Sequence, residues 1–132
     1  MVIAFYSSGE HVGLWDHVRE AFGRPDIYEI GGDPDNANPS RGWYAATTID
    51  DVPGAPIDRV FFSPPDAATM PGITSLGDYD HEQSVYIFGH DDRDNGPISC
   101  ECVVYIDTPI SQALYAVQAA GIVLHDKHHR GL

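Results

Sequence analysis

The chain has 132 residues, 42% of them hydrophobic, and this length fits one domain with a buried core. Its 20 acidic and seven basic residues give a net charge of −13 at pH 7. So acidic a chain lacks the basic clusters that unaided, non-specific nucleic-acid binding requires, so any RNA-binding role must account for the charge. Solubility is the simplest explanation of the charge.

Neither a membrane span nor a signal peptide is expected. The longest apolar run, near Ala119–Leu124, is too short to cross a bilayer. The opening residues MVIAFYSSGE lack a basic region and a long apolar core. Cys100 and Cys102 are separated by one residue, so in a strand both would point to the same face. Their simplest interpretation is two reduced thiols. We therefore expect a cytoplasmic protein.

The first third of the chain predicts a strand, a helix and a second strand. Ser7-Ser8-Gly9-Glu10 fits a capping box with Ser7 as the N-cap. Apolar residues then recur at helical spacing, so residues 9–22 predict an amphipathic helix that Gly23 ends. The expected strands are Met1–Tyr6 and Asp26–Ile30.

The middle of the chain is rich in turn formers. Residues 31–40 predict a long loop, followed by one helical turn near Trp43–Ala46. Thr47–Asp50 fits either a short strand or an extended link, and Asp58–Ser63 predicts a strand. One further helical turn is expected around Asp66–Met70.

The last third carries most of the functional signal. Val85–Phe88 and Cys102–Ile106 have the length and composition of buried strands, and each ends in a polar loop. A helix is expected over Pro109–His128, with Thr108 as the N-cap and Pro109 in the first position. Because ligands bind at the carboxyl ends of strands in open α/β sheets, these strand ends form a candidate site.

The alternation of strands with helices or long crossovers indicates the α/β class. Short, nearly continuous apolar strands favour a mostly parallel sheet of five or six strands, with helices on both faces. The last helix is apolar almost all round, and the sheet can cover only one side of it. We therefore expect a homodimer through this C-terminal helix. Ser111, Tyr115 and Gln118 share one helical face, which either lies in the interface or faces a ligand.

Three segments resemble the motifs of a known family. VYIFGHDDRDNG resembles a strand followed by Gly-x-Glu-x-Arg-Gly, and ALYAVQAAGIVLHD is similar to a helix that reads Ser-Leu-Asn-Val-Ser-Val-Ala-Ala-Gly-Ile. HVGLWDHVREAFG resembles Asn-x-Gly-x-x-x-Arg followed by Ala-Phe-Gly. The three occur in the order found in the SPOUT RNA methyltransferases, the SpoU/TrmH-like α/β-knot family.

This resemblance implies one α/β-knot domain over residues 1–132, with a deep trefoil knot at the C-terminal end and S-adenosylmethionine bound in the knot loops. The family also forms homodimers, and its cofactor contacts mainly backbone atoms of three loops. Carried over to this chain, the cofactor-binding positions are Phe62, Ser63, Phe88, Gly89, His90, Ile106, Asp107 and Leu114.

The resemblance also assigns catalytic positions, and most of them are substituted. The family's catalytic Arg falls on His17, its second-motif Glu on Asp91, and its third-motif Asn on Tyr115, while Arg93 is kept. His17 has a side chain whose ordinary pKa of about 6.5 suits a general base, although a solvated helix histidine is the simpler interpretation. Asp91 and Arg93 fit a loop-fixing ion pair equally well.

The expected activity is S-adenosylmethionine-dependent methylation of RNA, at a ribose 2′-hydroxyl of tRNA or rRNA. A catalytically degenerate cofactor-binding or protein-binding module is the alternative. A flavodoxin-like nucleotide binder is disfavoured because Ser7-Ser8-Gly9 is too short to cradle phosphates. No metal is expected, since the C-terminal cluster of His125, His128 and His129 fits a solvated end. The basic residues that could line an RNA groove across a dimer are Arg19, Arg24, Arg41, Arg59, Arg93, Lys127 and Arg130.

Overall fold

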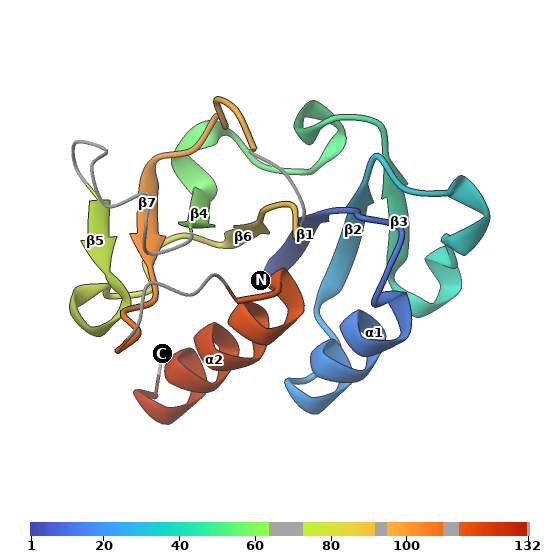
Figure 1. Cartoon of the computed structure of the whole chain (residues 1–132). Coiled ribbons are helices and arrows are strands. Elements are labelled where there is room, and N and C mark those ends of the chain that lie inside the picture. Colours follow the sequence, from blue (N-terminus) through green and yellow to red (C-terminus); the bar gives the residue numbers. More distant parts are fainter. Residues whose placement is uncertain (64–72, 92–94, 110–113, 132) are drawn as a thin grey trace.

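The computed structural model describes residues 1–63, 73–91, 95–109 and 114–131. Seven strands form one sheet in the order β3-β2-β1-β6-β4-β7-β5, and every neighbouring pair is parallel (Figure 1). The strands are β1 Val2–Tyr6, β2 Asp26–Ile30, β3 Trp43–Ala46, β4 Arg59–Ser63, β5 Ile73–Ser75, β6 Val85–Phe88 and β7 Cys102–Tyr105. The α/β class and the parallel sheet are confirmed, with seven strands where five or six were expected.

The centre of the sheet is buried on both faces. β1, β6 and β4 lie side by side, and all residues of β4 and β6 are buried. A parallel sheet covered on both faces favours such continuous apolar runs. On the face that packs against the two α-helices, Phe62 stacks on Phe88, with ring centroids 5.1 Å apart. The aromatic side chains therefore hold β4 and β6 together near their carboxyl ends.

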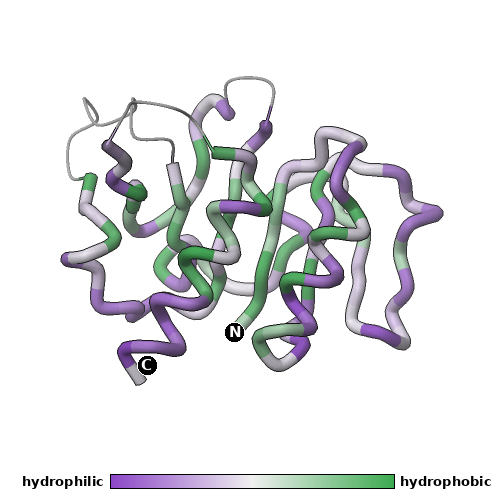
Figure 2. The backbone as a smooth tube through the Cα atoms, turned by 60° about the horizontal axis from the view of Figure 1, so that its bottom comes forward, coloured by the Kyte–Doolittle hydropathy of each residue, from purple (hydrophilic) through white to green (hydrophobic). Residues whose placement is uncertain are grey.

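Both α-helices of the described residues cover the same face of the sheet. α1 spans Val12–Ala21 and α2 spans Ala116–His129, and the two lie side by side (Figures 1 and 2). The opposite face is covered by a 3-10 turn at Ile49–Asp51, by Val52 and by Ile98. Helices on both faces are therefore not confirmed. The connection between β3 and β4 forms two short 3-10 turns, Ile49–Asp51 and Pro56–Asp58, and the second begins at a proline.

The start of α1 differs from the expected capping box. His11 precedes the helix in a left-handed conformation, with φ of 64°, and its side chain makes no cap hydrogen bond. The Ser7 hydroxyl accepts the Gly9 N–H at 3.1 Å and donates to Glu29 at 2.7 Å. Ser7 therefore ties the end of β1 to β2 and does not begin a helix.

The start of α2 is also later than expected. The helix begins at Ala116, so Thr108 and Pro109 lie outside it, and Ser111 falls outside the described residues. Val117, Ala120, Val123 and Leu124 are buried, while Gln118 is exposed and Ile122 keeps 42% of its surface exposed. In this chain alone the helix is therefore buried on one side, and the covering of its other side by a second copy stays a prediction. Figure 2 shows hydrophilic residues in its last turns.

Three smaller expectations also change. Trp43–Ala46 is β3 and not a helical turn, because these residues pair with Ile27–Ile30. Thr47–Asp50 is neither a strand nor a link: Thr48 caps a 3-10 turn by accepting the Asp50 N–H at 3.3 Å. The turn expected at Asp66–Met70 lies outside the described residues.

The two cysteines lie on opposite sides of the sheet. Cys102 in β7 packs on the side of the α-helices, and Cys100, which precedes β7, packs on the other side. Both thiols are free.

In the parts of the chain that the structure describes, no helix combines the length and apolarity needed to cross a membrane.

Candidate functional site

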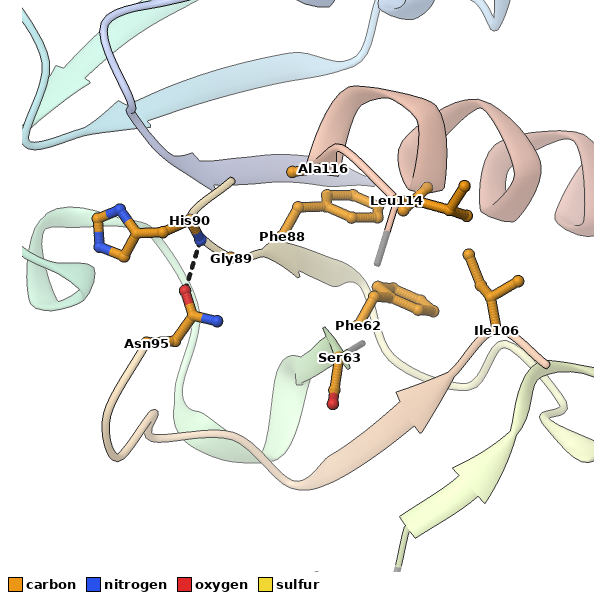
Figure 3. Close-up of a pocket in the computed structure, with 10 residues that line it drawn as sticks. Phe62, Ser63, Phe88, Gly89, His90, Asn95, Ile106, Leu114 and Ala116 are labelled. Atoms are coloured by element: carbon orange, nitrogen blue, oxygen red, sulfur yellow. Dashed lines mark hydrogen bonds between the residues drawn. The ribbon is translucent and has the colours of Figure 1, made fainter. Parts of the chain in front are cut away.

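The carboxyl ends of β4, β6 and β7 surround an apolar hollow that the first turn of α2 closes (Figure 3). Its free space is about 440 Å³, including the part open to solvent, but the centre of a water-sized sphere reaches only about 30 Å³ of it. The hollow is therefore narrow as it stands. It is lined by Phe62, Ser63, Phe88, Gly89, His90, Asn95, Ile106, Leu114, Ala116 and Ala119.

The walls of the hollow are aromatic and aliphatic. The stacked rings of Phe62 and Phe88 form one side, and the side chains of Ile106 and Leu114 lie across from them (Figure 3). Such walls suit a flat, uncharged ring, with the few polar groups supplied by backbone at the strand ends.

Gly89 brings bare backbone to the edge of the hollow. A Cβ at this position would lie 2.4 Å from the amide atoms of Asn95, closer than real contacts allow. Asn95 Oδ1 in turn accepts a hydrogen bond from the His90 N–H (Figure 3). The Asn95 side chain therefore covers the backbone that a ligand would approach at Gly89 and His90.

Asp91 connects three segments that are distant in sequence. Its Oδ1 accepts the Ala116 N–H at 2.6 Å, and its Oδ2 accepts the Ser8 hydroxyl at 3.2 Å. A carboxylate at a helix N-terminus satisfies an otherwise unpaired N–H and favours the helix dipole. Asp91 thus caps α2 and does not line the hollow, so its geometry is that of a positioning residue.

His11 and Tyr115 bring the first and third motif segments together. Their ring centroids lie 4.9 Å apart, and Tyr115 is 52% exposed. Among the described residues, His11 Nε2 has no hydrogen-bond partner although it is buried, and the nearest carboxylate oxygen, on Glu10, is 3.8 Å away. Within the described part of the chain, His11 Nε2 is therefore a buried polar atom without a hydrogen bond beside Tyr115.

The structure gathers most of the sequence-predicted binding residues. All of the eight cofactor positions except Asp107 line the hollow. Of the catalytic positions, His17 is exposed on α1 and does not line it, and Arg93 lies outside the described residues. Sequence reasoning missed Asn95, Ala116 and Ala119, and only the motif spacing on α2 could have indicated the two alanines.

Two of the basic residues are buried and cannot line an open groove. Arg19 and Arg59 are 1% and 4% exposed. Arg59 donates to the carbonyls of Ile49 and Val52, and Arg19 binds Asp16 at 3.0 Å. The prediction that these two guanidinium groups line an RNA groove is therefore wrong, because both are buried and hydrogen-bonded within the chain.

The C-terminal histidines do not gather a ligand set. The rings of His125 and His129 stack with centroids 5.7 Å apart. Within the described ranges, no group of three His, Cys, Asp or Glu side chains is placed to hold a metal ion.

The sequence matches no family model and no curated protein. Solved structures do match. The SpoU methyltransferase AviRb from Streptomyces viridochromogenes, in complex with the cofactor AdoMet, has a TM-score of 0.75 at 18% identity, over 98% of this chain and 57% of that one. An AdoMet-bound rRNA methyltransferase from Sinorhizobium meliloti gives 0.72 at 17% identity, over 99% and 56%. The chain has the SpoU methyltransferase fold.

TrmJ from Z. mobilis ZM4 shares the SpoU fold of this chain more distantly, with a TM-score of 0.60 at 13% identity over 95% and 66% of the two chains. The resemblance inferred from the three motifs is thus confirmed at the level of the fold. The chain spans less than three fifths of the length of the first two SpoU-fold structures.

Proposed function

We propose that this chain is an S-adenosylmethionine-dependent RNA methyltransferase and that the cofactor binds in the hollow at the ends of β4, β6 and β7. The observation that carries the proposal is the convergence of three strand ends on bare backbone at Gly89 beside an apolar pocket. Two proteins of the same fold were crystallised with AdoMet, which supports the cofactor.

The residues of the hollow fit this cofactor chemically. The rings of Phe62 and Phe88 suit an adenine, and the backbone of Gly89 and His90 suits its polar edge. Asn95 must turn away to open the space, which costs its hydrogen bond to the His90 N–H. Bound S-adenosylmethionine supplies an electrophilic methyl group on a positive sulfonium, and a chain of net charge −13 attracts such a cation.

Methyl transfer to a ribose hydroxyl also needs a group that takes up the hydroxyl proton or stabilises the oxyanion. His17 is one candidate, since its imidazole is exposed to an approaching RNA or second protomer. His11 is the second, because its buried Nε2 lacks a hydrogen bond beside Tyr115 at the start of α2. The ribose 2′-hydroxyl of tRNA or rRNA is the proposed target.

The quaternary structure is part of the same proposal. Leu14 on α1 and Ile122 on α2 are 54% and 42% exposed, and the two helices lie side by side. A second copy packed on these helices would cover both side chains. We also include a deep trefoil knot at the C-terminal end and a cytoplasmic location, with which the two free thiols agree.

A second candidate function is a binding module that kept the fold without catalysis. Two observations favour it: the narrow space in the hollow, and the replacement of the family's first-motif residues by His11 and His17. In this case the chain binds the cofactor or a partner protein, and no methyl group reaches RNA.

Calorimetric titration with S-adenosylmethionine and S-adenosylhomocysteine tests the proposal. We expect saturable binding of both at one site per chain, and absence of binding for both would remove the methyltransferase reading. Labelled methyl transfer to total RNA then separates the enzyme from the module. Loss of transfer in His17→Ala but not in His11→Ala assigns the proton acceptor to His17, and the opposite result assigns it to His11.

A further inference from the structure

A second hollow lies at the same edge of the sheet, over the carboxyl ends of β1 and β2 and the turn after β3. Its lining includes Tyr6, Ser7, Gly31, Thr47, Thr48 and His90. The free space is about 670 Å³ including the open part, and a water-sized sphere's centre reaches about 340 Å³ of it. The corresponding space in the first hollow is about 30 Å³, so this is the roomier of the two.

His90 lies between the two hollows and lines both. Its ring points away from Phe88, Ile106 and Leu114 in the first hollow (Figure 3). That ring lies 5.1 Å from the ring of Tyr6, centroid to centroid, at an angle of 45°. The two hollows therefore share one residue, and the second has an aromatic wall of two rings.

Hydroxyl groups supply the polar part of the second hollow. Ser7 donates to Glu29 at 2.7 Å and accepts the Gly9 N–H at 3.1 Å, which leaves one acceptor position on its oxygen. Glu29 is only 2% exposed, and a Cβ on Gly32 would lie 2.2 Å from its carboxylate. The Ser7 hydroxyl is thus held rigidly from behind by a buried carboxylate.

No carboxylate, ammonium or guanidinium group is among the described residues that line this hollow. A tyrosine phenol is protonated at neutral pH and can donate, and burial raises the pKa of Tyr6 further. A ligand here meets aromatic rings, hydroxyls and backbone. This lining fits an uncharged planar ring with donors and acceptors on its edge, and it offers nothing that would neutralise a phosphate.

We propose that this second hollow holds an unpaired nucleobase of the RNA acceptor, next to the cofactor hollow across His90. The inference rests on the proposed function. A chain of net charge −13 gains little from phosphate contacts, so its affinity for RNA must come from the bases. Aromatic rings and hydrogen bonds to base edges are how proteins hold single-stranded RNA, at about 1–3 kcal/mol for each stacked base.

The test uses the four nucleosides, adenosine, cytidine, guanosine and uridine, with the full chain saturated with S-adenosylhomocysteine. Saturation of the first hollow prevents adenosine from binding there. We expect amide chemical-shift changes at Ser7, Gly31 and Thr48 with at least one nucleoside. Changes confined to other parts of the chain, or none with any nucleoside, would overturn the inference.

Two tryptophan substitutions form a matched pair. Thr47 is exposed and lines the second hollow, so Thr47→Trp fills it. Ala45 on β3 is also exposed but does not line the hollow. We expect nucleoside affinity to fall at least tenfold in Thr47→Trp and to stay unchanged in Ala45→Trp, with thermal unfolding as the check on folding. Equal affinity in the two variants would place the nucleoside elsewhere and reject the site.

The failure of this inference differs from the failure of the proposed function. Binding of S-adenosylhomocysteine without any nucleoside keeps the methyltransferase proposal and removes the base site. Nucleoside binding without S-adenosylhomocysteine binding removes the acceptor role, because no methyl donor would then be present. Labelled methyl transfer adds a kinetic readout: Thr47→Trp should raise the KM for RNA more than it lowers kcat, and the reverse split would contradict a binding role.

Discussion

The two ends of α2 are held in opposite ways. At its start, the helix closes the apolar hollow, and a single carboxylate, Asp91, caps it from a distant loop. At its end, Asp126 accepts hydrogen bonds from His81 Nε2 at 2.6 Å and from Arg130 Nε at 3.0 Å. His81 Nδ1 is also hydrogen-bonded to the Tyr86 hydroxyl. The start of α2 is thus held by one side-chain hydrogen bond from Asp91 beside the hollow. The end is held by several connected hydrogen bonds among His81, Tyr86, Asp126 and Arg130.

The polar cluster at the end of α2 has a buried part, His81 and Tyr86, and a part-exposed part, Asp126 and Arg130. Tyr86 is completely buried, and burial raises its pKa; burial also raises the pKa of Tyr79 to about 12. Arg130 donates to the carbonyls of Leu76 and Tyr79 as well as to Asp126. A satisfied cluster of this kind stabilises one arrangement of the fold. The polar contacts at the end of α2 thus lie at one edge of the sheet, and the proposed ligand site lies at the other.

The largest expected effect is on stability at the end of α2. Asp126→Ala leaves His81 without its acceptor and Arg130 without its carboxylate, so we expect a loss of about 2–4 kcal/mol in the free energy of unfolding. Urea unfolding measures it, with Glu82→Ala, an exposed carboxylate nearby in the sequence, as the control. An equal and small effect for both would show that the cluster contributes little.

The next effect is on binding at the hollow beside the start of α2. A Cβ in Gly89→Ala would meet Asn95 at 2.4 Å and intrude on the approach of the cofactor. We expect at least tenfold weaker S-adenosylmethionine binding, about 1.4 kcal/mol, by calorimetry. Gly77→Ala is the control, since the nearest atom to its new Cβ is 3.9 Å away. Unchanged affinity in Gly89→Ala would move the cofactor out of this hollow.

Asp91→Ala removes the cap of α2 and the bond from Ser8. The helix start loses its N–H acceptor, so we expect stability to fall by about 1 kcal/mol. Since Ala116 and Ala119 line the hollow, cofactor affinity should fall by a similar free energy, about fivefold. Asp91→Asn keeps an acceptor oxygen and should restore most of both. A variant that loses affinity at full stability would instead indicate direct contact with the ligand.

The smallest effect is the pH dependence of stability. Burial lowers the pKa of His81, so as pH falls below its ordinary value of about 6.5 the unfolded chain takes up a proton that the folded chain refuses. Stability therefore falls on acidification. Burial raises the pKa of Asp126, but hydrogen bonds from His81 and Arg130 outweigh it and hold this pKa low. Protonation of Asp126 therefore lowers stability further at more acidic pH.

Urea midpoints at pH 7.5 and pH 5.5 test this, and His81→Asn should flatten the difference between them. Asparagine tolerates the left-handed backbone at this position, where φ is 53°. A slope as steep in His81→Asn as in the original chain would assign the pH dependence to other groups.

Local sequence patterns predicted the strand ends that build the hollow and the C-terminal ends of both helices, but not where the helices start. The apolar runs of β4, β6 and β7 stop at polar or proline-rich loops, so their carboxyl ends could be located without a structure. The start of α2 could not, because its cap is Asp91, 25 residues earlier in the chain, and the local Thr108-Pro109 signal is unused. A cap supplied through tertiary structure leaves no nearby pattern.

The same limit explains the polar residues. An arginine is expected at the surface, yet Arg19 is buried. Its guanidinium donates hydrogen bonds to Asp16 and to the carbonyls of Pro25 and Arg41, which compensates its charge and donors. His81 has no flanking motif, and its partners Tyr86 and Asp126 come from a strand and a distant helix. β5 was missed because a strand of three residues carries too little pattern to distinguish it from a loop.

The strand order has a consequence for how the chain folds. β1 lies inside the sheet, next to the central strand β6, which begins 83 positions later, with Val2 opposite Val85. β6 also provides the only link between β1 and β4 in the order of strands. Until Val85–Phe88 docks, the backbone N–H and C=O groups along that edge of β1 have no strand to pair with. Such late, long-range pairing is slow and prone to association between chains, so refolding yield should depend strongly on protein concentration.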